Sequence, residues 1–105
     1  MKMILLLYLE DDATCVRSLL KGHDVLAYSE LPLEGHGEGG EAGWYGRVAP
    51  FHSRMAFTVL PEERADQLLA SVRESRGCQG SKHPIHALRL GVEKVTRSGA
   101  LGSPE

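Results

Sequence analysis

Two strand–helix–strand patterns follow one another along this chain, and their order constrains the fold more than any other feature. In the first pattern, residues 4–8 form a continuous apolar run that predicts a buried strand. A helix follows, and we expect Asp11 and Asp12 to cap its start and Gly22 to stop it. Its apolar residues recur at helical spacing: Ala13, Val16, Leu19 and Leu20. Residues 25–33 complete the pattern as a second strand, whose far half is placed at an edge or a bend by a proline.

The second pattern begins with a strand at residues 54–60. The next helix is expected to start at Pro61 and to stop at Gly77, because proline suits the first turn and glycine the end. Its apolar stripe consists of Ala65, Leu68, Leu69 and Val72. Residues 85–90 predict the last strand, which residues 92–97 extend or flank.

Two such patterns in tandem correspond to the βαββαβ order of an α+β, ferredoxin-like sandwich, in which an antiparallel sheet carries both helices on one face. The third strand has mostly apolar residues on both of its sides: Met55, Phe57 and Val59 on one, and Ala56, Thr58 and Leu60 on the other. We therefore expect the second face of the sheet to be covered in an oligomer. Residues 1–97 are expected to form a single domain, followed by a flexible tail over residues 98–105.

Composition and charge argue against several classes of protein. The formal net charge is −2 and the basic residues form no run, so nucleic-acid binding is not expected. The apolar run at residues 3–9 is too short to span a bilayer, and acidic residues follow it where a signal peptide would have a cleavage site. We expect a cytoplasmic protein with reduced thiols at Cys15 and Cys78. No spacing of nucleophile, base and carboxylate favours an enzyme.

A long glycine-rich stretch, residues 34–53, separates the second and third predicted strands. Hairpin connections usually take roughly two to five residues, and the longer loop costs only about 1.4 kcal/mol more in closure entropy than a short turn. Folding thus permits this loop but does not require it. Two interpretations follow: the loop is functional, or it is disordered. Trp44, Tyr45 and Phe51 favour a functional loop, because linkers tend to lack large apolar groups. The candidate residues for binding a partner are Trp44, Tyr45 and Arg47.

Three stretches, "LEGHGEGGE", "FTVLPEERADQLLASVRESRG" and "IHALRLGVEKVTRSG", resemble segments of the PII-type nitrogen regulators. The first is similar to the lead into the long T-loop of that family, the second to its third strand and second helix, and the third to its last strand and the basic segment beyond. The resemblance implies a homotrimer whose inter-subunit clefts bind an adenine nucleotide (ATP, ADP or AMP) or another small anion such as bicarbonate. The loop would then dock onto a membrane transporter, an enzyme or another regulator.

The resemblance also implies which residues contact the effector. Gly35 and Gly37, with His36 between them, would let the backbone approach the ligand, and Arg97 would match a basic residue that contacts phosphate. The stretch "RGCQGSKHPIH" departs from the family, because it is poorer in glycine than the phosphate-cradling loop at that place. Lys82 is its candidate contact to a phosphate. Whether the effector is a nucleotide, a different anion or neither stays open.

Histidines support an alternative function, which is divalent metal binding of the kind that a similarity to CutA-type trimers implies. Four histidines are candidate ligands for zinc, copper or nickel: His36, His52, His83 and His86. In an extended strand the last two would point to opposite faces, so they chelate one metal only if Pro84 bends the chain. The simpler interpretation is that all four are surface or loop histidines.

Overall fold

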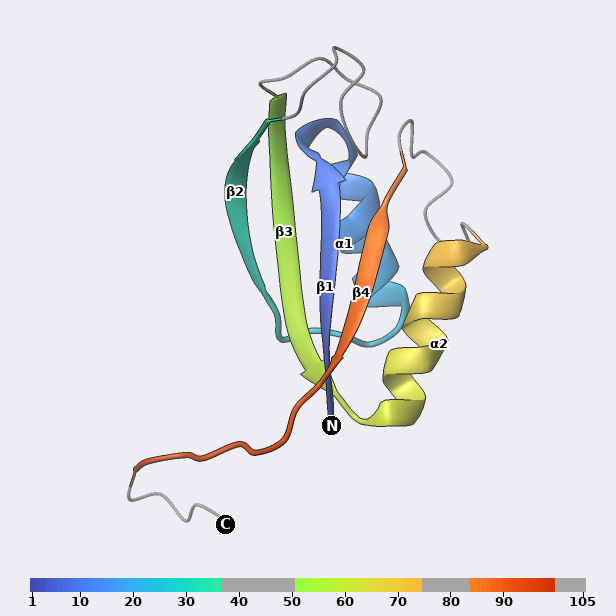
Figure 1. Ribbon diagram of the computed structural model, residues 1–105. Helices are drawn as coiled ribbons and strands as arrows, with labels where there is room; N and C mark the ends of the chain where they lie inside the picture. The colour runs from blue at the N-terminus through green and yellow to red at the C-terminus, as the bar shows by residue number, and fades with distance from the viewer. Residues whose placement is uncertain (37–50, 75–83, 100–105) are drawn as a thin grey trace.

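The computed structural model describes residues 1–36, 51–74 and 84–99, which form a four-stranded antiparallel sheet and two helices (Figure 1). The strands and helices follow in the predicted order, with a short 3-10 helix added: β1 (Lys2–Leu9), η1 (Glu10–Asp12), α1 (Ala13–Gly22), β2 (Ser29–Gly35), β3 (Phe51–Leu60), α2 (Glu62–Arg73) and β4 (His86–Gly91). The strands lie in the order β2-β3-β1-β4, and both helices pack on one face (Figure 1). This α+β arrangement is compatible with the predicted ferredoxin-like fold.

Alternate residues of the two central strands form the core with the helices. Ile4, Leu6 and Tyr8 of β1 and Ala56 and Leu60 of β3 are buried on the helix side. The helices contribute the apolar stripes that the sequence predicts: Ala13, Val16, Leu19 and Leu20 from α1, and Ala65, Leu68, Leu69 and Val72 from α2. The strand period of two and the helix period of about 3.6 thus bring their apolar residues into one shared layer.

The other face of the sheet, called the open face here, is apolar and carries no helix among the described residues (Figure 1). The strand register places these side chains together on it: Leu31 and Leu33 of β2, Met55, Phe57 and Val59 of β3, Met3, Leu5 and Leu7 of β1, and Leu88 and Leu90 of β4. None of them is fully buried, and Val59 and Leu90 are 36% and 44% exposed. The prediction that the third strand is apolar on both sides is confirmed.

Helix α1 ends at the predicted residue, but its cap lies beyond that residue. The helix ends at Gly22, but the left-handed residue beyond it is Asp24, with a φ of 58°. The N–H groups of Asp24 and Val25 donate to the carbonyl oxygens of Lys21 and Leu20, both over 2.9 Å, which is the pattern of a Schellman cap. Because Val25 is buried in this cap, β2 begins further along the chain than predicted.

The predicted helix starts are also wrong in detail. Asp12 is the N-cap residue of α1 but makes no side-chain capping hydrogen bond. Asp11 and Asp12 instead belong to η1, whose backbone bond from the Ala13 N–H to the Glu10 carbonyl oxygen leads into the helix. Pro61 is the N-cap residue of α2, which therefore begins one position later than predicted, at Glu62.

Strands β2 and β3 extend into the predicted loop. Gly35 pairs with Phe51 and Glu34 with His52, so the connection comprises residues 36–50 rather than 34–53. Residues 37–50 lie outside the described part of the chain, and so does the prediction made for them. Helix α2 ends at Arg73, before its predicted stop at residue 77.

The last described segment, residues 92–99, is called the C-terminal arm here and leaves the sheet at the end of β4 (Figure 1). The Val92 N–H still donates a hydrogen bond to the Met1 carbonyl oxygen, with an N–O distance of 3.3 Å. Beyond Val92 the arm contains no strand, so the predicted extension of the last strand is not seen in the described residues.

Cys15 lies on α1, packs against the core and is disulfide-bonded, so the expectation of a reduced thiol there is wrong. The spacing of two cysteines in a sequence says nothing of their proximity in the fold, and Cys78 lies outside the described residues. The expectation of reduced thiols relied on the predicted cytoplasmic location, which stays a prediction. Within the described ranges, the helices are too short or too polar to cross a membrane.

Candidate functional site

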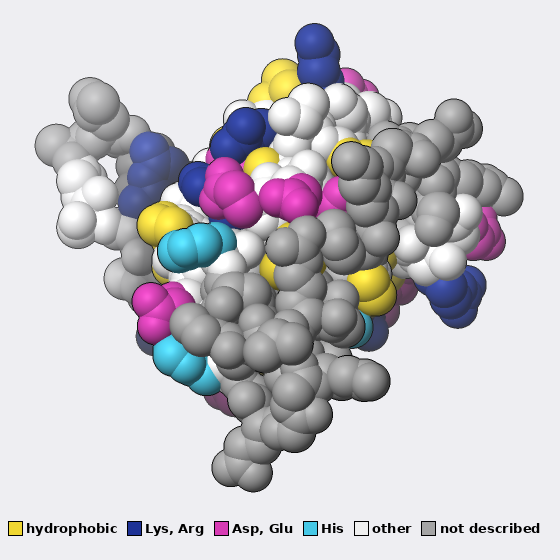
Figure 2. Space-filling model, turned by 90° about the horizontal axis from the view of Figure 1, so that it is seen from above, with side chains coloured by type: hydrophobic (Ala, Val, Ile, Leu, Met, Phe, Trp, Pro, Cys, Tyr) yellow, Lys and Arg dark blue, Asp and Glu magenta, His cyan; other side chains and the backbone are white. Residues whose placement is uncertain are grey.

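The long connection leaves and re-enters the sheet at one end of the molecule, between β2 and β3. Glu34 and His52 face each other there in the strand register, and His36 Nε2 lies 2.7 Å from Glu34 Oε2. Both side chains of this contact are about two-thirds exposed (66% and 62%), so it adds little to stability. Among the described residues visible on this end, acidic, basic and histidine side chains are intermingled (Figure 2).

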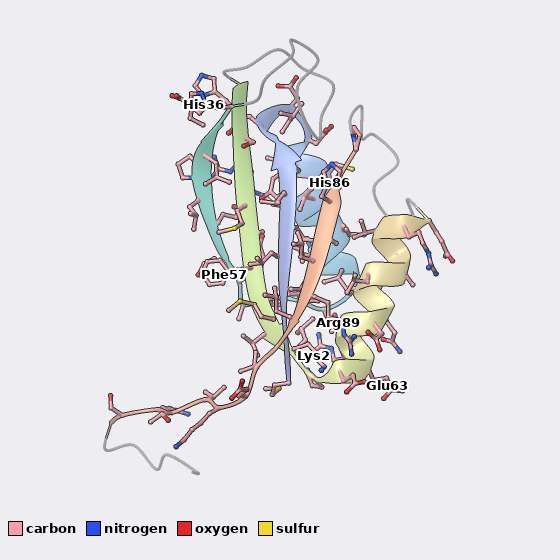
Figure 3. The ribbon with its side chains drawn as sticks, viewed as in Figure 1. Lys2, His36, Phe57, Glu63, His86 and Arg89 are labelled. Carbon is pink, nitrogen blue, oxygen red and sulfur yellow. The ribbon has the colours of Figure 1, made fainter. Side chains whose placement is uncertain are left out.

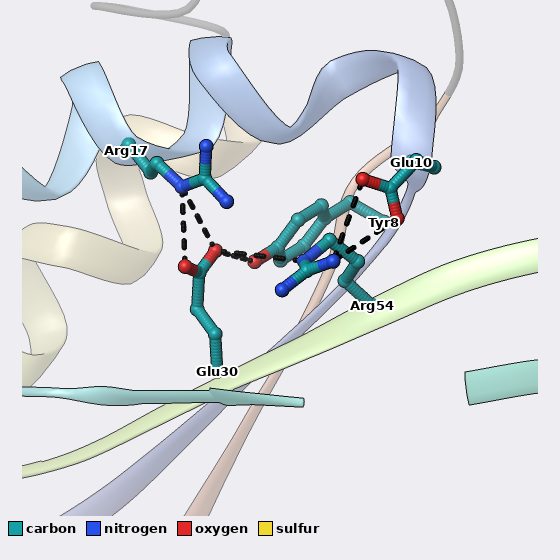
Figure 4. Close-up of polar contacts among 5 residues, drawn as sticks. All are labelled: Tyr8, Glu10, Arg17, Glu30 and Arg54. Carbon is teal, nitrogen blue, oxygen red and sulfur yellow. Dashed lines mark hydrogen bonds and ion pairs between the residues drawn. The ribbon is translucent and has the colours of Figure 1, made fainter. Parts of the chain in front are cut away.

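A network of polar side chains lies between α1 and the sheet, close to this end (Figure 4). The Tyr8 hydroxyl donates to Glu30 Oε2 over 2.8 Å, and Arg17 Nε donates to both oxygens of the same carboxylate over 3.1 and 3.2 Å. Arg54 Nη1 donates to Glu10 Oε1 over 3.1 Å. Arg54 Nε is buried, has no hydrogen-bond partner among the described residues and lies 3.9 Å from Glu30 Oε2.

The proton positions of this network follow from its burial and its charges. Desolvation raises the pKa of Tyr8 well above its ordinary value, and the hydrogen bond to Glu30 raises it further. Desolvation alone would raise the pKa of Glu30 as well, but hydrogen bonds from Tyr8 and Arg17 outweigh it, so the pKa of Glu30 is lowered. At neutral pH Tyr8 is therefore a proton donor and Glu30 a carboxylate.

The network braces the frame of the long connection. Glu30 is on β2, the strand that enters the connection, and Arg54 is on β3, the strand that leaves it. Tyr8 and Glu10 tie both to the end of β1, and Arg17 ties them to α1. Two guanidinium groups face two carboxylates, so the cluster has no surplus charge with which to attract an anion. Its geometry supports positioning rather than ligand binding.

The predicted effector residues lie at opposite ends of one chain. Gly35 ends β2 and His36 follows it, next to the long connection (Figure 3). Arg97 is exposed on the C-terminal arm, which leaves the sheet at the other end (Figure 1). Arg97 can therefore join Gly35 and His36 in one site only if it comes from a second copy. The remaining predicted contacts lie outside the described residues: Gly37, Trp44, Tyr45, Arg47 and Lys82.

Among the predicted metal ligands, His36 and His52 both lie next to Glu34, and His86 lies apart from them. His36 follows β2 and His86 begins β4, and these strands are the two opposite edges of the sheet (Figure 3). His52 faces Glu34, but residues 1–36, 51–74 and 84–99 hold no cluster of three or more side chains of the types that bind metals. His83 lies outside these ranges.

A groove of about 350 Å³ runs between α2 and the edge strand β4, and is called the α2–β4 groove here. Most of its lining is apolar, with His86 among it, and two residues of opposite charge lie seven positions apart on α2. The apolar residues are Leu69, Ala70, Val72, Ile85 and Ala87, and the charged pair is Asp66 and Arg73. Sites for small ligands occupy roughly 300 to 1,000 Å³, so this groove is at the small end of that range.

Sequence reasoning missed both the network and the groove. The signal for the network is present, because Glu30 and Arg54 are charged residues within apolar strands, at positions that face the helices. A charge on a helix-covered face must be paired to be tolerated. The groove has no comparable signal, because its residues are ordinary members of an apolar stripe and an edge strand.

Comparison with known proteins assigns no family, since no protein-family model matches the chain and no curated protein matches it. The resemblance to PII-type regulators stays a prediction from the sequence.

Proposed function

We propose that the protein is a small PII-like regulator, a homotrimer that senses a small effector in clefts between its subunits and acts on a partner through the connection at residues 36–50. The observation that carries the proposal is the open face, a continuous apolar surface on a sheet of the order β2-β3-β1-β4. Contiguous apolar patches of this kind mark contact surfaces, because leaving them in water is unfavourable.

The open face supports assembly and the braced strands support a role for the connection. Burying a large apolar side chain contributes roughly 1.5 to 3 kcal/mol, so an interface over the centre of the open face stabilises an assembly strongly. A closed ring of three copies would cover three such faces without leaving one exposed. The network around Glu30 and Arg54 holds the two strands that flank the connection in fixed positions.

In this proposal the effector is an adenine nucleotide or another small anion, and it binds near Gly35 and His36 of one copy. Arg97 reaches the same cleft only from another copy. A charge-assisted hydrogen bond from Arg97 would be worth roughly 1.5 to 3 kcal/mol, which corresponds to about a ten- to hundredfold change in affinity.

Calorimetry with ATP, ADP, AMP, bicarbonate and zinc tests the proposal. We expect one of the anions to bind, and Arg97→Ala to weaken it about ten- to hundredfold while the assembly stays intact. Zinc binding that is lost in His36→Ala and unaffected by Arg97→Ala would support the metal alternative instead. If no anion binds the wild-type assembly below the millimolar range, the sensing function is wrong.

A further inference from the structure

The C-terminal arm presents apolar and charged side chains to water. Residues 93–99 make no backbone hydrogen bond to the other described residues, and Val95 is 66% exposed. In an extended segment alternate side chains point to the same side, so Glu93, Val95 and Arg97 share one side of the arm. Along that side an acidic, an apolar and a basic side chain follow one another. The first and the last are four residue steps apart, which is about 13 Å at roughly 3.3 Å per residue.

The α2–β4 groove has the complementary pattern. Arg73 is at one end and Asp66 is at the other, where its carboxylate also pairs with Arg89 Nε at 3.1 Å; Leu69 and Val72 lie between them. Seven residue steps of helix separate the two charged residues, which is about 10 Å at roughly 1.5 Å per residue. The arm and the groove thus match in length as well as in the order of charge, apolar centre and charge.

We propose that the α2–β4 groove of one copy receives the C-terminal arm of a second copy of this chain, as a strand added beside β4. Val95 enters the apolar centre of the groove, Glu93 lies near Arg73, and Arg97 lies near Asp66. Because β4 and α2 run in opposite directions, this pairing makes the arm parallel to β4 (Figure 1).

The free edges of the sheet favour β4 over β2 as the docking edge. Each of these strands has a neighbour on one side only, within the described sheet. Pro32 removes a backbone donor from β2, and prolines of this kind protect an edge from a further strand. Strand β4, His86–Gly91, contains no proline, so no missing donor or proline ring prevents a further strand from pairing along its outer edge.

The arm of the same chain does not fit the groove. The arm leaves β4 at the end of the groove that carries Asp66. There Arg89 Nη2 lies 3.2 Å from Glu62 Oε2, and Arg89 Nε lies 3.1 Å from Asp66 Oδ1. Folding back along β4 would place Glu93 beside these two carboxylates. It would also break the bond from the Val92 N–H to Met1, which directs the arm away from the groove. A second copy meets neither obstacle.

This inference requires association of the chain but not the sensing function. It gives Arg97 a contact to the Asp66 carboxylate of a second copy in place of an effector contact, so it predicts that Arg97→Ala weakens association, whereas the proposed function predicts weaker anion binding by an intact assembly. A diazirine photo-crosslinker in place of Val95, in a mixture of isotopically light and heavy chains, tests it directly. We expect crosslinks to residues 65–73 or 85–87 that join light to heavy chains. Crosslinks within single chains only, crosslinks elsewhere on the surface, or no crosslinks would overturn the inference.

Charge exchange provides an independent test by analytical ultracentrifugation. Arg73→Glu and Glu93→Arg should each weaken association about threefold or more, and the double variant should recover most of the loss, since it restores opposite charges. Val95→Ser should weaken association about tenfold, because a desolvated apolar contact is removed. The matched controls are Leu26→Ser, an exposed apolar residue outside the groove, and Lys94→Ala, on the other side of the arm; both should change it less than twofold.

A double variant no better than either single one, or Val95→Ser equal to Leu26→Ser, would show that the arm does not dock in this groove. Failure of the arm is distinguishable from failure of the proposed function. Suppose that the arm variants do not change association but lysine substitutions on the open face separate the subunits. Docking of the arm in the groove is then wrong, and assembly through the open face stands.

Discussion

Glu30 is the residue on which the polar side of this small core depends. Its carboxylate accepts a hydrogen bond from the fully buried Tyr8 and two from Arg17, and Arg54 stands beside it. Strands β1, β2 and β3 and helix α1 all meet at this group. Removal of the carboxylate would leave the buried Tyr8 hydroxyl and Arg17 Nε without their acceptor, and Arg54 without a nearby opposite charge.

Replacement of Glu30 tests this role. We expect Glu30→Gln to lower the free energy of unfolding by about 1.5 to 3 kcal/mol, because a neutral amide cannot replace charge-assisted hydrogen bonds. Urea denaturation followed by circular dichroism at pH 7 measures the loss. Glu63→Gln, at an exposed position of α2, serves as the control and should change stability by less than about 0.5 kcal/mol. Equal stabilities for the two variants would mean that the network adds nothing.

The network also predicts how stability depends on pH. The pKa of Glu30 is lowered from its ordinary value of 4.5 in the folded state, so the unfolded chain binds more protons in the acid range. The stability that Glu30 contributes is thus fully present above the unfolded pKa and is lost as pH falls through the folded pKa. Tyr8 changes stability with pH in the opposite direction, because its pKa is raised in the folded state. The stability that Tyr8 contributes is lost as pH rises above 10.

Unfolding free energies of the wild type and Glu30→Gln across the pH range check this expectation. The difference between them should be constant near neutrality and shrink as the pH falls below 4.5. Likewise, Tyr8→Phe should differ less from the wild type above pH 10 than at pH 7. A difference that grows on acidification would contradict the assigned direction of the Glu30 shift.

At the scale of elements, the junction between α1 and β2 shows how a helix end sets where a strand begins. Asp24 adopts the left-handed conformation, and the cap draws Val25 into the core. Arg64 of α2 donates to the carbonyl oxygens of His23 and Asp24, both over 3.1 Å, and so ties the second helix to the end of the first. The residues between Val25 and β2 then carry the chain to the far edge of the sheet.

Two alanine substitutions only two positions apart should have opposite effects on stability. Gly22→Ala should stabilise the protein by roughly 0.5 to 1 kcal/mol, because the residue is helical and an added Cβ meets nothing within 4 Å. Asp24→Ala should destabilise it by about 1 kcal/mol, because alanine disfavours a positive φ. Thermal or urea unfolding measures both. The cap assignment would fail if Asp24→Ala proved as stabilising as Gly22→Ala.

At the scale of the whole molecule, the sheet has one covered face and one open face. The open face contains its most exposed apolar side chains where β3, β1 and β4 lie side by side, since Met3 pairs with both Val59 and Leu90. Val59 and Leu90 are exposed in the single chain, so a charged residue at either position should leave the fold of each subunit unchanged. They are therefore suitable positions at which to test assembly.

The wild type should elute with close to three times the 11.5 kDa chain mass in size exclusion coupled to light scattering. The double variant Val59→Lys with Leu90→Lys should be monomeric at micromolar concentration, because lysine charges cannot be buried unpaired in an interface. Leu26→Lys, which is 78% exposed and lies off the open face, is the matched control and should assemble normally. A wild type that is monomeric at this concentration would remove the inter-subunit cleft from the proposed function.

The sequence by itself determined the order of the strands and helices and which of their residues form the core. Both are encoded locally, as in the run at residues 4–8 and the stripe of Leu68 and its neighbours on α2, because a period of two or about 3.6 sets the faces of an element wherever it lies. Only the tertiary structure decided the Tyr8–Glu30–Arg54 network, the Asp24 cap and the α2–β4 groove. The network and the groove join residues far apart in sequence, whose proximity depends on strand register and helix packing, and the cap depended on whether Gly22 or Asp24 took the left-handed conformation. A local pattern carries none of that information.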